Sequence, residues 1–161
     1  MRFLPILFVF VFLMAACASG PGERHEAIAE AHAAMGVLHD SLMAAHDAIR
    51  AEHDALVELH TSPAEEGRYP QHDSLLVAHR DQLNVLSSLL DDHRQRLDAM
   101  AAQLEQHAAG DVAGSEADAE HDAIEAALAE IEADHARIRE THQHLRREHV
   151  QLRHDHEEVV P

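Results

Sequence analysis

Histidines recur every seven residues along most of this chain. The sequence has 17 histidines, and fifteen of them fall on two such series. A seven-residue spacing is close to two turns of an α-helix, so it returns each side chain to the same face and is typical of helices that pack along a seam. The first series is His25, His32, His39, His46, His53 and His60. The second is His72, His79, His93, His107, His121, His135, His142, His149 and His156, with Leu86, Met100, Gly114 and Leu128 at its other positions.

Two clusters of helix-breaking residues divide the chain after its N-terminal segment. Gly67 and Pro70 belong to the first cluster, and Gly110 and Gly114 belong to the second. They leave three helical segments at residues 22–60, 71–108 and 115–158. The short connections between them force neighbouring helices to run antiparallel. Tryptophan is absent and β-branched residues are few, which argues against a β-rich fold. We therefore expect an all-α, up-down-up three-helix bundle or coiled coil over residues 22–158.

The aliphatic residues beside the series change their spacing in the middle segment. In the first and third segments an aliphatic residue follows each series position by three residues, as Ile28 follows His25. In the second segment leucine follows by four, as Leu76 follows His72. An antiparallel neighbour needs this change to bring the two series level. The predicted layers are His25/His107/His121, His32/Met100/Leu128, His39/His93/His135, His46/Leu86/His142, His53/His79/His149 and His60/His72/His156, with Leu, Ile and Met layers between them.

Buried imidazoles need partners. An unpaired polar group in a core costs about 1 to 2 kcal/mol, and Leu86, Met100 and Leu128 indicate that the series positions are buried. Three imidazoles that meet from three helices resemble the ligand set of zinc, with a fourth position open; nickel or copper would also suit. The predicted metal ligands are the twelve histidines of the four complete layers, together with His46 and His142. The acids predicted to orient them are Asp40, Asp54, Asp92, Glu120, Asp134 and Glu148.

Two other functions stay open. The first is a structural or pH-responsive helical spacer with no physiological metal, whose histidine layers hold water or anions. The second is a zinc-hydroxide hydrolase, but no separate pocket or general base stands out, so we expect no enzyme. His144 and His154 lie off both series and are expected on the surface. The repeated seam could also pair between chains, which would give self-association.

The N-terminal segment predicts export. Arg2, an apolar run to Met14 and two alanines precede the single cysteine, Cys17, and this pattern is typical of a secretory leader. The residues Leu13-Met14-Ala15-Ala16-Cys17 resemble the lipobox of bacterial lipoproteins. The resemblance implies a leader at 1–16, a lipidated Cys17 at the start of a short linker to residue 21, and an outer-membrane address, facing the periplasm or the exterior. The alternative is ordinary signal-peptide cleavage near Cys17, which would give an unanchored periplasmic protein.

The charge of the chain limits its partners. The formal net charge is −18, and every fixed cation is an arginine. Phosphate binding needs a basic surface, so nucleic acid is excluded as a partner, whereas metal cations would be attracted. The sequence therefore predicts a cell-envelope lipoprotein that binds a divalent transition metal, zinc before nickel or copper, for buffering, capture or tolerance.

Overall fold

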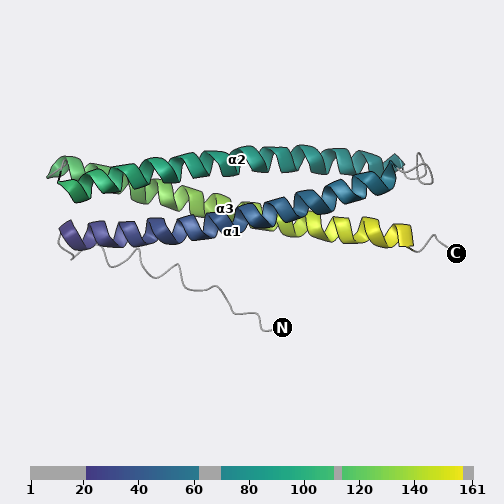
Figure 1. Ribbon diagram of the computed structural model, residues 1–161, viewed down its shortest axis with the longest axis horizontal. Helices are drawn as coiled ribbons and strands as arrows, with labels where there is room; N and C mark the ends of the chain where they lie inside the picture. Colours follow the sequence, from purple (N-terminus) through teal and green to yellow (C-terminus); the bar gives the residue numbers. More distant parts are fainter. Residues whose placement is uncertain (1–20, 62–69, 111–113, 158–161) are drawn as a thin grey trace, which may run out of the picture.

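Three long helices form the structure. The computed structural model describes residues 21–61, 70–110 and 114–157. The helices are α1 (Pro21–His60), α2 (Pro70–Ala109) and α3 (Ser115–Glu157), and the described residues contain no strand. Each helix begins and ends within one residue of its predicted bounds. Figure 1 shows them side by side in a rod, with α2 antiparallel to α1 and α3. The predicted all-α three-helix bundle is confirmed.

Proline and glycine set the helix ends. Pro70 is the first residue of α2, where its missing N–H and fixed φ cost nothing. Gly110 follows α2 with φ of 80°, a left-handed conformation that favours glycine, and its N–H donates to the carbonyl of His107 at 3.0 Å. Gly114 has φ of 71°, and its carbonyl accepts the N–H of Asp118 at 3.2 Å as α3 begins. These turns reverse the chain within a few residues.

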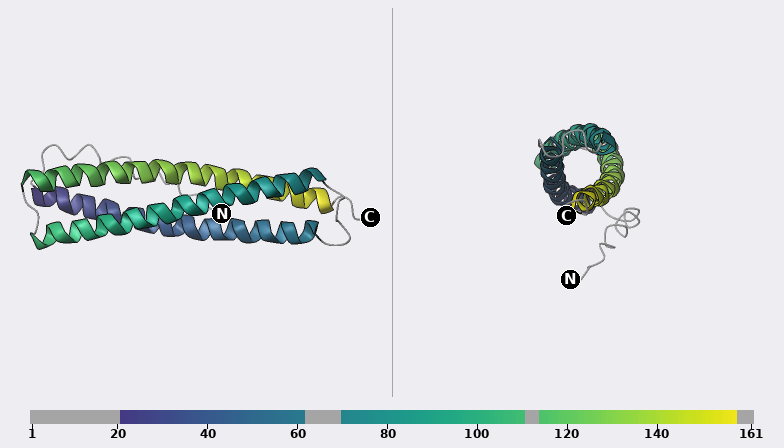
Figure 2. Two further views of the ribbon diagram at one scale, coloured as in Figure 1. Left: turned by 90° about the horizontal axis from the view of Figure 1, so that it is seen from above. Right: turned by 90° about the vertical axis from the view of Figure 1, so that its right-hand side faces the viewer.

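Aliphatic layers alternate with the histidine layers along the rod. Figure 2 shows, end on, the three helices surrounding a common axis. Each aliphatic layer takes one residue from each helix, and all fifteen residues are buried. The layers are Ile28/Leu104/Ile124, Met35/Leu97/Ile131, Leu42/Leu90/Ile138, Ile49/Leu83/Leu145 and Leu56/Leu76/Leu152. In α2 each leucine follows a series position by four residues instead of three. This change of spacing aligns the α2 leucines with the aliphatic residues of the two antiparallel neighbours.

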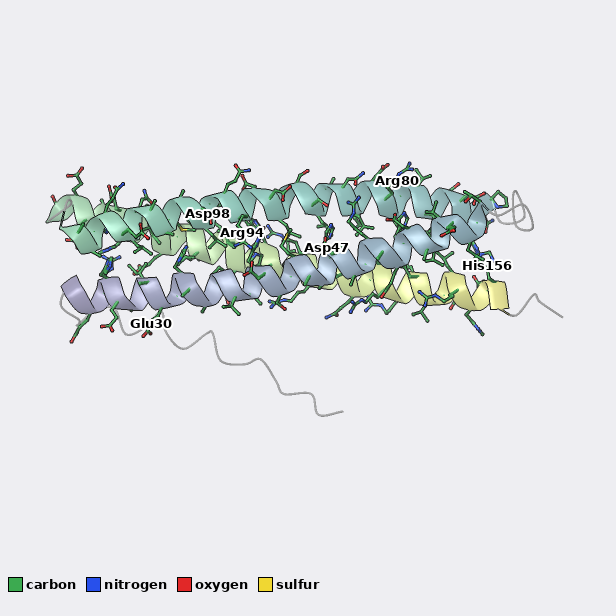
Figure 3. All side chains as sticks on the ribbon, viewed as in Figure 1. Glu30, Asp47, Arg80, Arg94, Asp98 and His156 are labelled. Atoms are coloured by element: carbon green, nitrogen blue, oxygen red, sulfur yellow. The ribbon has the colours of Figure 1, made fainter. Side chains whose placement is uncertain are left out.

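Charged side chains cover the outside of the rod, as Figure 3 shows for Glu30, which points away from the bundle. Several of them join neighbouring helices. Arg24 of α1 pairs with Glu125 of α3 at 3.1 Å, and Arg96 of α2 pairs with Glu130 of α3 at 2.8 Å. Such pairs at the surface of the rod contribute little each, about 0 to 1 kcal/mol for solvent-exposed pairs, so the buried layers dominate stability. No described helix contains a stretch apolar enough to cross a membrane.

Candidate metal centres

Four groups of three histidines meet on the axis of the bundle. Each group takes one histidine from each helix, and its three candidate ligand atoms lie within 4.8 Å of one another. These groups are the four complete layers predicted from the sequence. They are His25/His107/His121, His39/His93/His135, His53/His79/His149 and His60/His72/His156. The antiparallel course of α2 brings its histidines level with those of the two parallel helices.

The histidines of α1 and α3 pair in register. His39 Nδ1 lies 3.2 Å from His135 Nε2, and His25 Nδ1 lies 3.3 Å from His121 Nε2, both at hydrogen-bond distance. At the far end His60 Nε2 lies 2.7 Å from His156 Nε2. The paired residues are always 96 positions apart, because both helices run in the same direction with the same repeat.

Carboxylates of α3 hold the α2 histidines. The Nε2–H of His79 donates to Glu148 at 2.8 Å, and that of His93 donates to Asp134 at 3.1 Å. His107 donates to Glu120 through the same atom. A carboxylate is only an acceptor, so it fixes the proton of a neutral imidazole on Nε2 and leaves the lone pair on Nδ1.

The fourth α2 histidine follows the same pattern at a longer distance, with His72 Nε2 lying 3.4 Å from the Asp155 carboxylate. All four acids directly precede an α3 core histidine in the sequence. In the two layers without a third histidine, Ala127 and Thr141 stand at this position. At this α3 position an acid therefore stands only in the layers that contain an α2 histidine. Histidines that bind a metal generally have their second nitrogen held by such a partner.

The two incomplete layers satisfy His46 and His32 in other ways, whereas Nδ1 of His142 is buried without a hydrogen-bond partner among the described residues. His46 lies 3.1 Å from His142, and its Nε2 lies 2.8 Å from the hydroxyl of Ser87. His32 Nε2 lies 2.8 Å from the carbonyl of Leu97, so the ring donates to it. His46 and His142 were predicted as metal ligands; the structure brings them together, but neither belongs to a group of three candidate ligands among the described residues. Leu86 stands where a third ligand would lie.

Burial favours the neutral form of nine core histidines. Eleven of the fifteen series histidines are buried, whereas His25, His32, His72 and His107 are half-buried. Burial is also the largest cause of lowered pKa values, because it disfavours the charged imidazolium. For His135, His142 and His149 it lowers the pKa from 6.5 to about 4, with the neighbouring core histidines adding to the effect. The pKa is also lowered for His39, His46, His53, His60, His93 and His121.

Neutral imidazoles at this spacing suit a transition metal. Zinc binds histidine nitrogen at about 2.0–2.1 Å, which places tetrahedral ligands about 3.3 Å apart. The α1–α3 pairs at 3.2 and 3.3 Å already have that separation. Several buried nitrogens also have no hydrogen-bond partner among the described residues, including Nδ1 of His79 and His93 and Nε2 of His39. The groups of three can therefore hold a metal ion after small movements of the rings.

Only some of the acids predicted to orient the core histidines contact them. Three of the six acids predicted for this role, Glu120, Asp134 and Glu148, do contact core histidines. Asp40 instead pairs with Arg94 on the surface, and no described hydrogen bond joins Asp54 or Asp92 to a core histidine. Those three assignments are wrong, because the side chains lie on the outer flank of their helices.

Four partners of the core histidines were not singled out from the sequence. Asp73 contacts His60, Asp155 lies near His72, and Ser87 and the Leu97 carbonyl serve the incomplete layers. The signal that marks Asp155 in the sequence is its place directly before His156. His144 and His154, which lie off both series, are exposed as expected.

The surface hollows do not centre on the groups of three. One lies over the small residues Ala48, Ala51 and Ala55 of α1, beside Arg153. Another lies between α1 and α2 and reaches His53 and His60. Cys17 and the predicted leader lie outside the described residues. Comparison of the chain with protein-family models, with curated proteins and with solved structures found no match in any of the three.

Proposed function

We propose that this chain is a cell-envelope lipoprotein that binds divalent transition metal ions in its four complete histidine layers. One observation carries the proposal: three imidazoles from three helices converge at each layer, with ligand atoms within 4.8 Å. Zinc is the preferred ion, because three imidazoles and an open position are a common zinc set, and nickel or copper would bind similar ligands. Up to four separate sites suit buffering, capture or tolerance of metal better than catalysis at one centre.

Titration of the metal-stripped protein tests this proposal. Zinc, nickel and copper are added in turn at about pH 7.5, where neutral imidazoles bind metal, while heat release and circular dichroism are recorded. We expect several equivalents bound below micromolar concentration, with a rise in melting temperature, because binding across helices stabilises the fold. A matched variant with His39, His93 and His135 all changed to Leu should lose one equivalent. A fully helical protein that binds none of the three metals would refute metal binding.

A helical spacer is the second candidate function. It is favoured by the incomplete layers, where Ser87, His142 and the Leu97 carbonyl satisfy His46 and His32 without metal. In a spacer, the triple leucine variant would gain stability and keep its function. Growth of a deletion strain in excess zinc, nickel or copper separates the two candidates. Sensitivity to a metal supports metal handling, and a wild-type response to all three supports the spacer.

Lipid attachment at Cys17 is the part of the proposal that places the protein in the envelope. It rests on the resemblance of residues 13–17 to a lipobox, and an outer-membrane address rests on Ala18 after the cysteine. Labelling of growing cells with a radioactive fatty acid should mark the wild-type protein and leave the Cys17→Ser variant unlabelled. Release of the wild-type protein in a soluble, unlabelled form would show ordinary signal-peptide cleavage instead.

A further inference from the structure

The four complete layers differ in how their nitrogens are satisfied. In His39/His93/His135 a hydrogen bond at 3.2 Å joins two of the rings, and three nitrogens have no described partner. In His25/His107/His121 two contacts of 3.0 and 3.3 Å join the rings. In His60/His72/His156 a contact of 2.7 Å joins two rings, and Asp73 holds His60. A metal ion that binds any of these paired nitrogens must first break a contact between imidazoles.

The layer His53/His79/His149 has no described hydrogen bond between its rings. Both nitrogens of His53, both nitrogens of His149 and Nδ1 of His79 are buried without a hydrogen-bond partner among the described residues. Glu52 lies 3.9 Å from His149 Nδ1, which is beyond hydrogen-bond distance. The only hydrogen bond described for this layer joins His79 to Glu148, and it turns the remaining lone pair of His79 away from the carboxylate.

The surroundings of this layer keep it unsatisfied. The aliphatic layer Ile49/Leu83/Leu145 on one side is at most 1% exposed, and Leu56/Leu76/Leu152 on the other side is at most 3% exposed. Water cannot easily reach the rings along the axis, and each unpaired buried nitrogen costs free energy. A ligand that satisfies these nitrogens therefore gains more here than in the other layers.

Two approaches lead to this layer from the surface. The hollow between α1 and α2 is lined by His53 and Asp73, and by the apolar side chains of Leu76 and Val77 beside the cationic Arg80. On the α2–α3 side the carboxylate of Glu148 lies 2.8 Å from buried His79 and 3.3 Å from exposed His144. On the α2–α3 side a cation arriving at the surface thus meets an imidazole and a carboxylate before it meets the core ligands.

We propose that His53, His79 and His149 form the primary metal site, which fills before the other three layers. The proposal rests on the proposed metal-binding function and assigns the order of loading within it. The physical reason is that zinc can bind either nitrogen of His53 or His149, and Nδ1 of His79, without displacing a hydrogen bond between imidazoles, whereas at least two nitrogens in each of the other layers are engaged in such a bond. Such a bond contributes about 0.5–1.5 kcal/mol, which corresponds to a preference of roughly 2- to 13-fold per bond.

Two single substitutions on α2 test the order. His79→Leu removes a ligand from the proposed primary site, and His93→Leu is its matched control, because both histidines are buried and both donate to an α3 carboxylate. Leu86 already occupies the equivalent α2 position in another layer, so leucine fits there. Zinc titration should show the tightest equivalent lost or weakened by more than about tenfold in His79→Leu and retained in His93→Leu.

A measurement on the wild-type protein does not depend on how the variants fold. Zinc is added to one equivalent, and the imidazole nitrogen resonances are followed by NMR. The signals of His53, His79 and His149 should shift first. Shifts that appear first in another layer, or equally in all four, would overturn the order while leaving metal binding intact. A protein whose resonances do not respond to zinc would refute the proposed function itself.

Discussion

Acidification should destabilise the metal-free protein because burial lowers the pKa of nine of its core histidines. Burial lowers the pKa of His135, His142 and His149 to about 4, whereas in the unfolded chain each returns to about 6.5. The unfolded state therefore binds more protons between these values. The stability that depends on the neutral rings is fully present above about pH 6.5 and falls as pH drops toward 4.

The magnitude follows from the size of the shifts. A difference of about 2.5 pKa units corresponds to about 3 kcal/mol per histidine when the whole range is crossed, of which about 2 kcal/mol is lost by about pH 5. The three α3 histidines together should thus cost about 6 kcal/mol between about pH 7.5 and pH 5. That is comparable with the whole stability of a typical domain, about 5–15 kcal/mol. The other six core histidines with lowered pKa values act in the same direction.

Urea unfolding followed by circular dichroism measures this loss on chelator-stripped protein across the pH range. His142→Leu is the informative variant, because the layer His32/Met100/Leu128 already holds one histidine and two apolar residues. The variant should lose about 2 kcal/mol of the pH dependence. Reduced repulsion among the carboxylates acts in the opposite direction on acidification, since the net charge is −18. A free energy of unfolding that stays constant from about pH 7.5 to pH 5, or a variant with an unchanged slope, would refute this account.

Four substitutions probe the layers directly. Leu86→His completes a fifth group with His46 and His142, so zinc titration should show one more equivalent bound. Adding Thr141→Asp should increase the zinc affinity of that fifth site about tenfold. An unchanged stoichiometry would contradict the layer geometry. Asp134→Asn should weaken zinc binding at one layer by about 10- to 100-fold without changing the number of sites, and unaltered affinities would show that the carboxylate does not position His93. Leu90 is 0% exposed, so Leu90→Ala should lower the free energy of unfolding in urea by about 2–5 kcal/mol. A decrease below about 1 kcal/mol would indicate a loosely packed core.

Self-association and lipid attachment concern other parts of the chain. The repeated seam predicts that hairpins of this protein could exchange between copies, and sedimentation of the purified protein measures that directly. Labelling at Cys17, described above, tests the lipid anchor. Both predictions rest on the sequence pattern, because the described residues comprise one chain and begin at residue 21.

The sequence by itself determined the number of helices, their bounds and the membership of every core layer. It could do so because a heptad repeat fixes which face of a helix is buried, and because the spacing from His72 to Leu76, against that from His25 to Ile28, fixes the direction of α2. The heptad repeat, the change of spacing in α2 and the short loops together predict the four groups of three histidines. No information on contacts between residues far apart in the sequence is needed for this prediction.

Only the tertiary structure decided which polar groups serve the core. A heptad repeat states that a residue flanks the seam, but it does not state which neighbouring helix stands on that flank. Asp134 and Asp40 are both acids beside a core histidine in the sequence, yet Asp134 reaches His93 and Asp40 pairs with Arg94. The difference arises because the order of the helices around the axis places the residues preceding the α3 histidines against α2. The same arrangement leaves the ring nitrogens of His53 and His149 without hydrogen-bond partners among the described residues, which no spacing in the sequence reveals.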